Sequence, residues 1–308
     1  MTDPRAVAAA VTTGVGYLLD HQDPDGAWTE WLLPPGSSPE WTTAFVALAL
    51  SEVPPRTGPS LRRRLSAAAK WLLEHQRDDG GWGYNAAVET DADTTSTTIL
   101  AIRAAGRDPP DTAFRRLALH QREDGGFATF IDGIPSSWTT SHPDVTPTCV
   151  CALLAGLANE DLVQRALPRV QRDRNPDGTW NSFWWDTHLY GTWVSMSLLR
   201  HAGLPVEAGE RLWSERPSTA LEIALLISCL CQAVPSERGR NAVEEWTAQL
   251  LSIQRDDGSW PSAPLLRVTN MDCYDPWDRA EAGPLFADPN RLFTTAAALR
   301  ALTNTTGS

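Results

Sequence analysis

The sequence has too little positive charge for a nucleic-acid-binding protein and no hydrophobic run long enough to cross a membrane. Its 308 residues contain 26 Lys and Arg against 38 Asp and Glu, a formal net charge of −12. A nucleic acid or an anionic membrane surface requires a basic face, and a membrane-spanning helix requires about 20 consecutive apolar residues. The N-terminal residues also lack the apolar segment of a signal peptide. A cytoplasmic protein with no nucleic-acid partner is therefore expected.

Cysteine is present, but its spacing is not that of a structural zinc site. Four of the five cysteines form two Cys-x-Cys pairs in apolar stretches, Cys149 with Cys151 and Cys229 with Cys231. Structural zinc sites use pairs separated by two to four residues. The pairs are therefore interpreted as reduced thiols in the core, and no zinc is expected.

Tyrosine and phenylalanine are few, at 4 and 7 residues, whereas tryptophan is frequent, at 14. A repeat explains part of this excess. Five segments carry an Asp-Gly pair followed closely by an aromatic residue, and these aromatic residues are Trp28, Trp82, Phe127, Trp180 and Trp260. The last interval is 80 residues, against 45 to 54 for the others, so one degenerate copy is expected within it and six units are predicted. Each aromatic ring is predicted to pack beneath its own turn.

Each unit is predicted to contain an amphipathic helix before the turn and a more apolar helix after it. The amphipathic helices are predicted at about 4–20, 60–76, 111–121, 160–170, 205–214 and 237–253. The apolar helices, with Thr-rich starts, are predicted at 41–52, 94–106, 146–158, 191–202, 218–233 and 291–303. Because apolar helices lie inside and amphipathic helices outside, residues 1–308 are predicted to form an all-α fold, a single α6/α6 barrel. All inner N-termini then face one mouth, near which the loops 128–144 and 261–290 are expected.

The most informative motif opens the second inner helix, and it reads Asp91-Ala92-Asp93-Thr94-Thr95. Two neighbouring carboxyl groups resist double ionisation, so one keeps its proton to a higher pH. The other is stabilised as an anion by the N–H groups of the helix terminus. Such a pair can keep a carboxylic acid available as a proton donor near neutral pH. The simpler interpretation is that Asp93 or Thr94 is only an N-cap, worth about 1 kcal/mol.

These features resemble known families. The aromatic turns resemble the Gln-Trp repeats of the terpene cyclase and protein prenyltransferase superfamily. The acidic motif resembles the Asp-x-Asp-Thr-Thr variant found in class II, protonation-initiated terpene cyclases, especially the bacterial drimenyl diphosphate synthase type. Two further segments resemble squalene–hopene cyclases, and they read Asp144-Val145-Thr146-Pro147-Thr148 and Leu189-Tyr190-Gly191-Thr192-Trp193.

The resemblance implies that Asp93 is the general acid and that Asp91 is its partner. The polar shell of the acid is expected from Thr94, Asp144, Thr148, His142 and His188. Thr148 stands where squalene cyclases have a histidine that hydrogen-bonds the acid. A water molecule or one of the two histidines of the shell would therefore have to replace that group.

A class II cyclase also needs a cavity that stabilises carbocations without attacking them, which aromatic faces can do. The aromatic residues predicted near the mouth are Trp41, Trp138, Phe183, Trp184, Trp185, Tyr190, Trp193, Trp277 and Phe293. Cations for a diphosphate are offered by Arg267, Arg279 and Arg291. A divalent ion such as Mg²⁺ between diphosphate and carboxylates is left open, and no metal site of the protein itself is assigned.

The resemblance thus implies an enzyme that protonates the terminal alkene of a linear prenyl diphosphate, of farnesyl or geranylgeranyl length, and cyclises it with the diphosphate retained. Class II cyclases usually place the cavity between two barrels, and this chain has length for one. The two long loops, a homo-oligomer or a second barrel subunit would have to supply the missing wall.

Two other interpretations stay open. A short barrel can be a non-catalytic subunit that pairs with another protein. A protein prenyltransferase β-subunit is disfavoured, because its zinc site needs an Asp, a Cys and a later His. Here Asp272 and Cys273 are adjacent, and no histidine follows His201.

Overall fold

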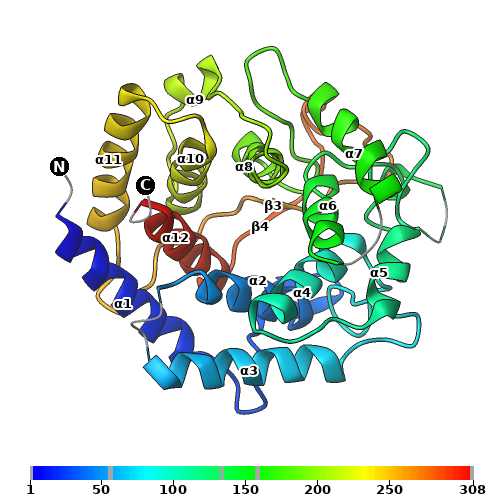
Figure 1. Ribbon diagram of the computed structural model, residues 1–308, viewed down its shortest axis with the longest axis horizontal. Coiled ribbons are helices and arrows are strands. Elements are labelled where there is room, and N and C mark those ends of the chain that lie inside the picture. The colour runs from blue at the N-terminus through cyan, green and yellow to red at the C-terminus, as the bar shows by residue number, and fades with distance from the viewer. Residues whose placement is uncertain (1–2, 55–57, 132, 134, 157–159, 306–308) are drawn as a thin grey trace.

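Two concentric rings of helices form the protein, whose computed structural model describes residues 3–54, 58–131, 133, 135–156 and 160–305 (Figure 1). The inner ring contains α2 (Glu40–Ser51), α4 (Ala92–Ala104), α6 (Thr146–Leu154), α8 (His188–His201), α10 (Ala220–Gln232) and α12 (Leu292–Thr305). The outer ring contains α1 (Pro4–Asp20), α3 (Gly58–Glu74), α5 (Asp111–Ala118), α7 (Glu160–Arg172), α9 (Glu210–Ser214) and α11 (Glu237–Ser252). Each inner helix packs against the next, and α12 packs against α2, which closes the ring. The predicted α6/α6 barrel is confirmed.

The aromatic residues that close the five repeat segments, called the closing aromatics, join the two rings of helices. They are Trp28, Trp82, Phe127, Trp180 and Trp260. All five are fully buried, as the sequence predicts. The four tryptophans donate from Nε1 to a main-chain carbonyl ten residues earlier in the outer helix, over 2.6–2.8 Å. The main-chain N–H of each of the five donates to a threonine hydroxyl of the following inner helix, and these threonines are Thr43, Thr95, Thr146, Thr192 and Thr295. The Thr-rich helix starts therefore serve the repeat as well as the helix.

In four of the five segments a glutamine stands four residues before the glycine of the Asp-Gly pair, and this side chain links one outer helix to the next. Gln22 Nε2 donates to Gly26 O within its own turn and to Arg64 O in α3. Gln254 Nε2 repeats this arrangement with Gly258 O and with Ala10 O in α1, at 3.0 Å. The last unit is thus hydrogen-bonded to the first across 244 positions of sequence.

Two short antiparallel hairpins accompany the helices, and no strand was predicted at either place. They are formed by β1 (Glu30–Leu33) with β2 (Gly36–Ser38), and by β3 (Leu266–Arg267) with β4 (Leu285–Phe286). Strands of two to four residues are too short to show an alternating hydrophobic pattern.

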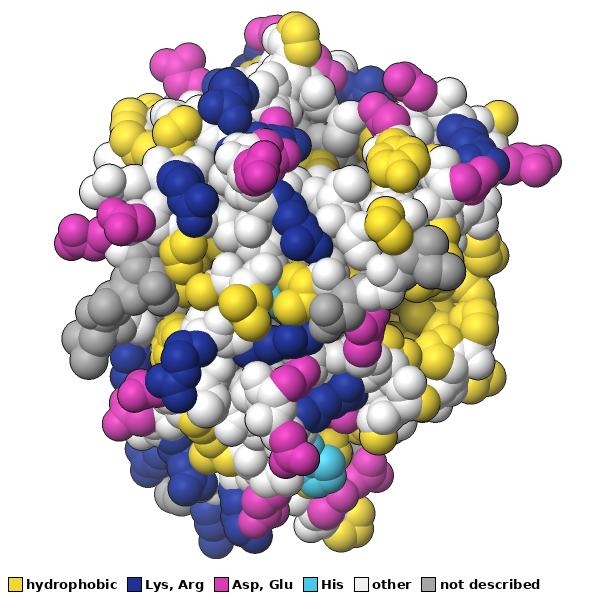
Figure 2. All heavy atoms as spheres, turned by 90° about the vertical axis from the view of Figure 1, so that its right-hand side faces the viewer, with side chains coloured by type: hydrophobic (Ala, Val, Ile, Leu, Met, Phe, Trp, Pro, Cys, Tyr) yellow, Lys and Arg dark blue, Asp and Glu magenta, His cyan; other side chains and the backbone are white. Residues whose placement is uncertain are grey.

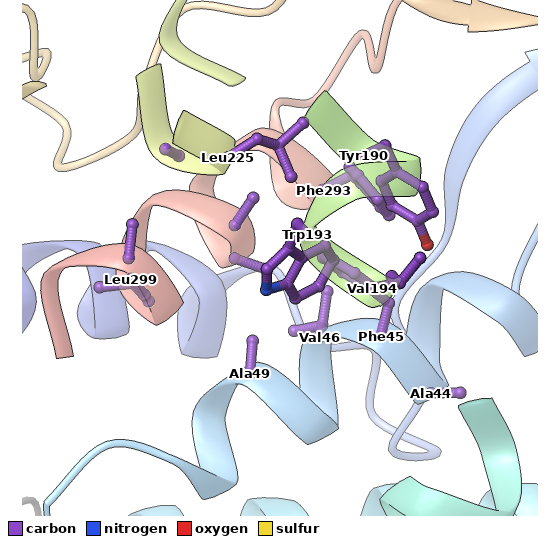
Figure 3. Packing of buried hydrophobic residues seen from close by; sticks show 14 of the residues in the cluster. Ala44, Phe45, Val46, Ala49, Tyr190, Trp193, Val194, Leu225, Phe293 and Leu299 are labelled. Carbon is purple, nitrogen blue, oxygen red and sulfur yellow. The ribbon is translucent and has the colours of Figure 1, made fainter. Parts of the chain in front are cut away.

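The interior of the barrel is filled with aromatic and aliphatic side chains. Trp193 of α8 lies among residues of α2, α10 and α12 (Figure 3). Phe45 and Phe293 stack with their ring centroids 3.8 Å apart. This close packing makes the inner ring a solid core rather than an open channel.

The surface seen in Figure 2 mixes acidic and basic side chains over most of its area, and hydrophobic side chains gather at its right-hand edge. Among the helices of the described ranges, none has both the length and the hydrophobicity needed to span a membrane.

Candidate active site

A cavity of about 250 Å³ lies where α2 and α4 begin. Its wall is mainly apolar and comes from segments far apart in the sequence. The hairpin β1–β2 and the segment before α4 contribute Leu33, Pro34, Pro35, Tyr84 and Val88. The loops 128–144 and 261–290 contribute Thr129, Phe130, Trp138, Leu266, Arg267 and Val268. Both long loops therefore contribute to the cavity wall.

Asp93 lies in the first turn of α4 and lines this cavity. Its Oδ1 is buried and has no hydrogen-bond partner among the described residues. Burial raises the pKa of Asp93 well above its usual range, and the negative charges of Asp91 and Asp144 raise this pKa further. The carboxyl group is therefore held in its protonated form, as a proton donor requires.

Asp91 is the N-cap of α4. Its Oδ1 accepts from the N–H of Thr94 at 2.6 Å, and its Oδ2 accepts from the Thr94 hydroxyl at 2.9 Å. Burial raises the pKa of Asp91 to about 7, against the lowering effect of these two bonds. Asp91 is thus the residue that caps α4, and the interpretation of Asp93 or Thr94 as the cap is wrong. Thr94 lies on the cavity wall, and the carboxyl group of Asp93 is not used as a cap.

Asp144 connects the acid to the aromatic segment before α8. Its Oδ2 accepts from the main-chain N–H groups of Phe183 and Trp184, both at 2.9 Å. Burial raises the pKa of Asp144 to about 6. Asp144 therefore has two effects, since it holds Trp184 in place and also opposes ionisation of Asp93.

His142 belongs to a hydrogen-bond chain that ends at the cavity. Its Nε2 lies 2.9 Å from the carbonyl of Ser137, so Nε2 carries the proton. Its Nδ1 then accepts from the Thr129 hydroxyl at 2.7 Å, and Thr129 Oγ1 in turn accepts from Trp184 Nε1 at 2.8 Å. Burial lowers the pKa of His142 to about 3, so the ring is neutral. Both ring nitrogens are occupied, and His142 is therefore not the hydrogen-bond partner of Asp93.

His188, the other histidine considered as a replacement, and Thr148, which stands at the histidine position, are also not brought to the acid. His188 Nε2 lies 3.0 Å from Glu215 Oε2, and its ring lies near Trp277. Thr148 is half-buried in α6. Neither side chain is among the described residues that line the cavity. A position near the start of an inner helix therefore does not by itself predict that a side chain reaches the acid.

Four of the nine predicted aromatic residues line the cavity, namely Trp41, Trp138, Trp184 and Trp185. Tyr190 and Phe293 do not line the cavity but stack on Trp185, with ring centroids 4.6 and 5.1 Å from that of Trp185. Trp193 packs against Tyr190, and Phe183 stacks on His142 at 3.8 Å. Trp277 is 38% exposed.

Two lining aromatic residues, Tyr84 and Phe130, were missed. They follow the closing aromatics Trp82 and Phe127 by two and three residues. The residues at the same offsets in the other three units do not line the cavity, so this spacing alone does not identify the wall.

The three predicted arginines separate in the structure. Arg267 lines the cavity. Arg279 pairs with Asp272 at 3.0 Å on an exposed loop. Arg291 donates to the Ser259 hydroxyl at 2.9 Å and belongs to the last aromatic turn. No group of three or more His, Cys, Asp or Glu is placed to hold a metal ion within the part of the chain that the structure describes.

Replacing Thr129 with valine is expected to destabilise the protein by about 1–3 kcal/mol, because Trp184 Nε1 and His142 Nδ1 both lose their partner in a buried place. Urea denaturation measures this cost. The matched control is Thr247→Val, since Thr247 is a buried threonine of α11 whose hydroxyl has no hydrogen-bond partner among the described residues. Equal stability of the two variants would contradict the hydrogen-bond chain.

The melting temperature is expected to fall as the pH rises from about 5 to about 7.5. Burial raises the pKa of Glu30 and of Asp91 to about 7, and that of Asp144 to about 6, whereas unfolded carboxyl groups titrate near pH 4. In this range these carboxyl groups, together with Asp93, bind more protons in the folded chain than in the unfolded chain. Burial lowers the pKa of His120 to about 4 and that of His142 to about 3, which acts in the opposite direction. The raised carboxyl groups are more numerous, so stability declines with increasing pH. Differential scanning calorimetry across the range checks the sign, and Asp144→Asn is expected to reduce the slope.

Comparison with known proteins gives a consistent set of relatives. Residues 11–130 match the family model described as the squalene-hopene cyclase N-terminal domain. The chain is 29% identical over 231 residues to drimenyl diphosphate synthase of Streptomyces showdoensis, covering 72% of this chain and 36% of that protein. It is 26% identical over 328 residues to squalene–hopene cyclase of Bradyrhizobium diazoefficiens, covering 83% and 47%. The chain thus spans less than half the length of these curated relatives.

A solved structure shares the whole fold. It is that of a variant of the type II terpene cyclase MstE from Scytonema, in complex with geranylgeranyl dihydroxybenzoate as substrate. The two structures superpose with a TM-score of 0.84 at 22% sequence identity, covering 99% of this chain and 98% of that one.

Proposed function

We propose, from its similarity to class II terpene cyclases, that the chain protonates the terminal alkene of a linear isoprenoid and cyclises the resulting cation. The observation that carries the proposal is Asp93, a carboxyl group with a raised pKa on the wall of an apolar aromatic cavity. A solvated acid that merely capped a helix would not support this chemistry.

The proposed reaction begins when Asp93 transfers its proton to the terminal double bond. A C–H bond forms, the π bond breaks, and a tertiary carbocation results. The next double bond attacks this cation, a ring closes, and the charge moves along the chain. Loss of a proton to a base, or capture of water, ends the sequence, and Asp93 regains a proton from solvent. The head group takes no part and stays attached.

Tryptophan faces supply what the cationic intermediates need. Trp41, Trp184 and Trp185 line the cavity that contains Asp93. Their rings attract positive charge through the quadrupole but are poor nucleophiles in this setting. The raised pKa of Asp93 and these rings therefore favour the two halves of the same reaction, namely proton donation and stabilisation of the cation.

We propose that one barrel is sufficient for the site. Trp138 Nε1 donates to Thr269 O at 2.6 Å, and Ser137 N donates to Met271 O at 2.9 Å. These bonds join the two long loops over the cavity, where other cyclases would place a second barrel. Support also comes from MstE, whose chain is matched over nearly its whole length. A second subunit is then not needed to complete the wall.

For the substrate we propose a prenyl chain of farnesyl or geranylgeranyl length that keeps its head group. The relatives suggest two kinds of head group, since one is named for a diphosphate and MstE was solved with a dihydroxybenzoate. If the head group is a diphosphate, a Mg²⁺ ion would be held mainly by its oxygens. Removing Mg²⁺ with EDTA would then weaken binding of that substrate.

Incubation in D₂O tests the reaction. Purified protein is mixed with farnesyl and geranylgeranyl diphosphates and with geranylgeranyl dihydroxybenzoate, and the products are analysed by mass spectrometry. Protonation followed by loss of a different proton yields a cyclic isomer with one non-exchangeable deuterium and an intact head group. Release of inorganic diphosphate with no deuterium in the hydrocarbon would contradict the proposal, because ionisation of the allylic ester starts the other class of cyclisation. Binding without turnover of any substrate would favour the non-catalytic barrel.

A further inference from the structure

One basic side chain contacts the cavity. Among the described residues of its wall, Arg267 is the single Lys or Arg, and this residue is 4% exposed. Arg267 lies in β3, and its main-chain N–H donates to Trp184 O at 2.7 Å. The neighbouring Leu266 forms a bridge with Trp185. The guanidinium is therefore fixed to the same segment that carries two tryptophans of the cavity.

One nitrogen of the Arg267 guanidinium has no hydrogen-bond partner among the described residues. Nη2 forms an ion pair with Asp186, and Cζ lies 5.8 Å from the ring centroid of Trp277. Nη1 is buried and has no hydrogen-bond partner among the described residues. A buried donor of this kind is costly to leave unpaired. A ligand oxygen in the cavity would satisfy it.

We propose that Nη1 of Arg267 binds the head group of the isoprenoid, and that this head group is a monoanion such as a carboxylate rather than a diphosphate. The inference rests on the proposed function, whose substrate it specifies. With the head group at Arg267, the hydrocarbon chain lies against Trp184 and Trp185, and its far alkene is free to reach Asp93 in the same cavity.

The balance of charge decides between the two head groups. Arg267 pairs with Asp186, whose charge is partly screened by water because its side chain is 44% exposed, and no second Lys or Arg lies on the described cavity wall. Asp91, Asp93 and Asp144 add acidic groups close by. A diphosphate would bring more than one negative charge to this place without a matching cation, which is unfavourable at a partly dry site. A carboxylate brings one charge and matches the geometry of a guanidinium.

Binding without turnover tests the inference separately from catalysis. The Asp93→Asn protein is titrated with geranylgeranoic acid, geranylgeraniol and geranylgeranyl diphosphate, each with and without Mg²⁺, and tryptophan fluorescence is followed. The acid is expected to bind at least about tenfold more tightly than the alcohol, as a hydrogen bond to a charged group would provide. Adding Arg267→Gln is expected to remove this difference and to leave affinity for the alcohol within about twofold.

Two further variants serve as controls. Arg279→Gln changes a basic residue of the same loop that pairs with Asp272 outside the cavity, and it is expected to leave all three affinities unchanged. Arg267→Lys, which keeps the charge, is expected to retain part of the preference for the acid. Tighter binding of the diphosphate than of the acid, with or without Mg²⁺, would overturn the inference, as would an equal loss for all three ligands in Arg267→Gln. Failure of the proposed function would appear differently, as the absence of deuterated product from every substrate.

Discussion

Asp93→Asn is expected to lower the rate of cyclisation on the order of 10³-fold, within the range found for loss of a general acid. The amide has nearly the same shape as the carboxyl group but no proton acidic enough to add to an alkene. The change leaves the N-cap of α4 in place, because that cap is Asp91. The fold should therefore persist, and single-turnover product formation measures the chemical step.

A matched control comes from another inner helix. Asp288 is a buried carboxyl group that accepts from the N–H and the hydroxyl of Thr294 in α12, as Asp91 does from Thr94 in α4. Asparagine keeps much of such a cap, so Asp288→Asn is expected to cyclise at nearly the normal rate. Wild-type activity should also fall as the pH rises through the pKa of Asp93, since only the protonated acid can react. Asp93→Asn with normal activity would refute the assignment of the acid.

Trp260→Ala is expected to destabilise the protein by about 3–5 kcal/mol, the usual cost of removing a large buried ring. The indole is fully buried, and its Nε1 donates to Leu250 O at 2.8 Å. Its turn also carries the bond from Gln254 to α1 that closes the outer ring. Loss of the ring therefore weakens the joint between the last unit and the first.

Trp260→Phe separates the volume of the ring from its hydrogen bond. The third unit already has phenylalanine at this place, and Phe127 is as buried as the tryptophans. Keeping most of the volume and losing one bond is expected to cost about 1 kcal/mol. Urea denaturation of the two variants measures the difference, and equal losses would show that the hydrogen bond, not packing, dominates.

Two long loops cover the mouth of this barrel and build much of the cavity wall. Phe130, Trp138 and Thr129 come from one of them, and Leu266, Arg267 and Val268 from the other. The hairpin β1–β2 adds a third part of the wall. The barrel has a mouth at which such segments can meet, so the cavity forms between the starts of the inner helices and the loops that connect them.

Most of the scaffold and the acid itself were determined by local sequence. Helix order follows from hydrophobic periodicity, the turns follow from Asp-Gly pairs, and the placement of Asp91 and Asp93 follows from the start of one helix, because each depends on residues a few positions apart. The burial of Arg267 and the choice of Trp138 and Trp184 for the cavity wall were decided by tertiary structure. They depend on contacts between segments far apart in the sequence, such as Trp184 with Thr129 over 55 positions and Trp138 with Thr269 over 131, and no spacing in the sequence encodes which loops meet.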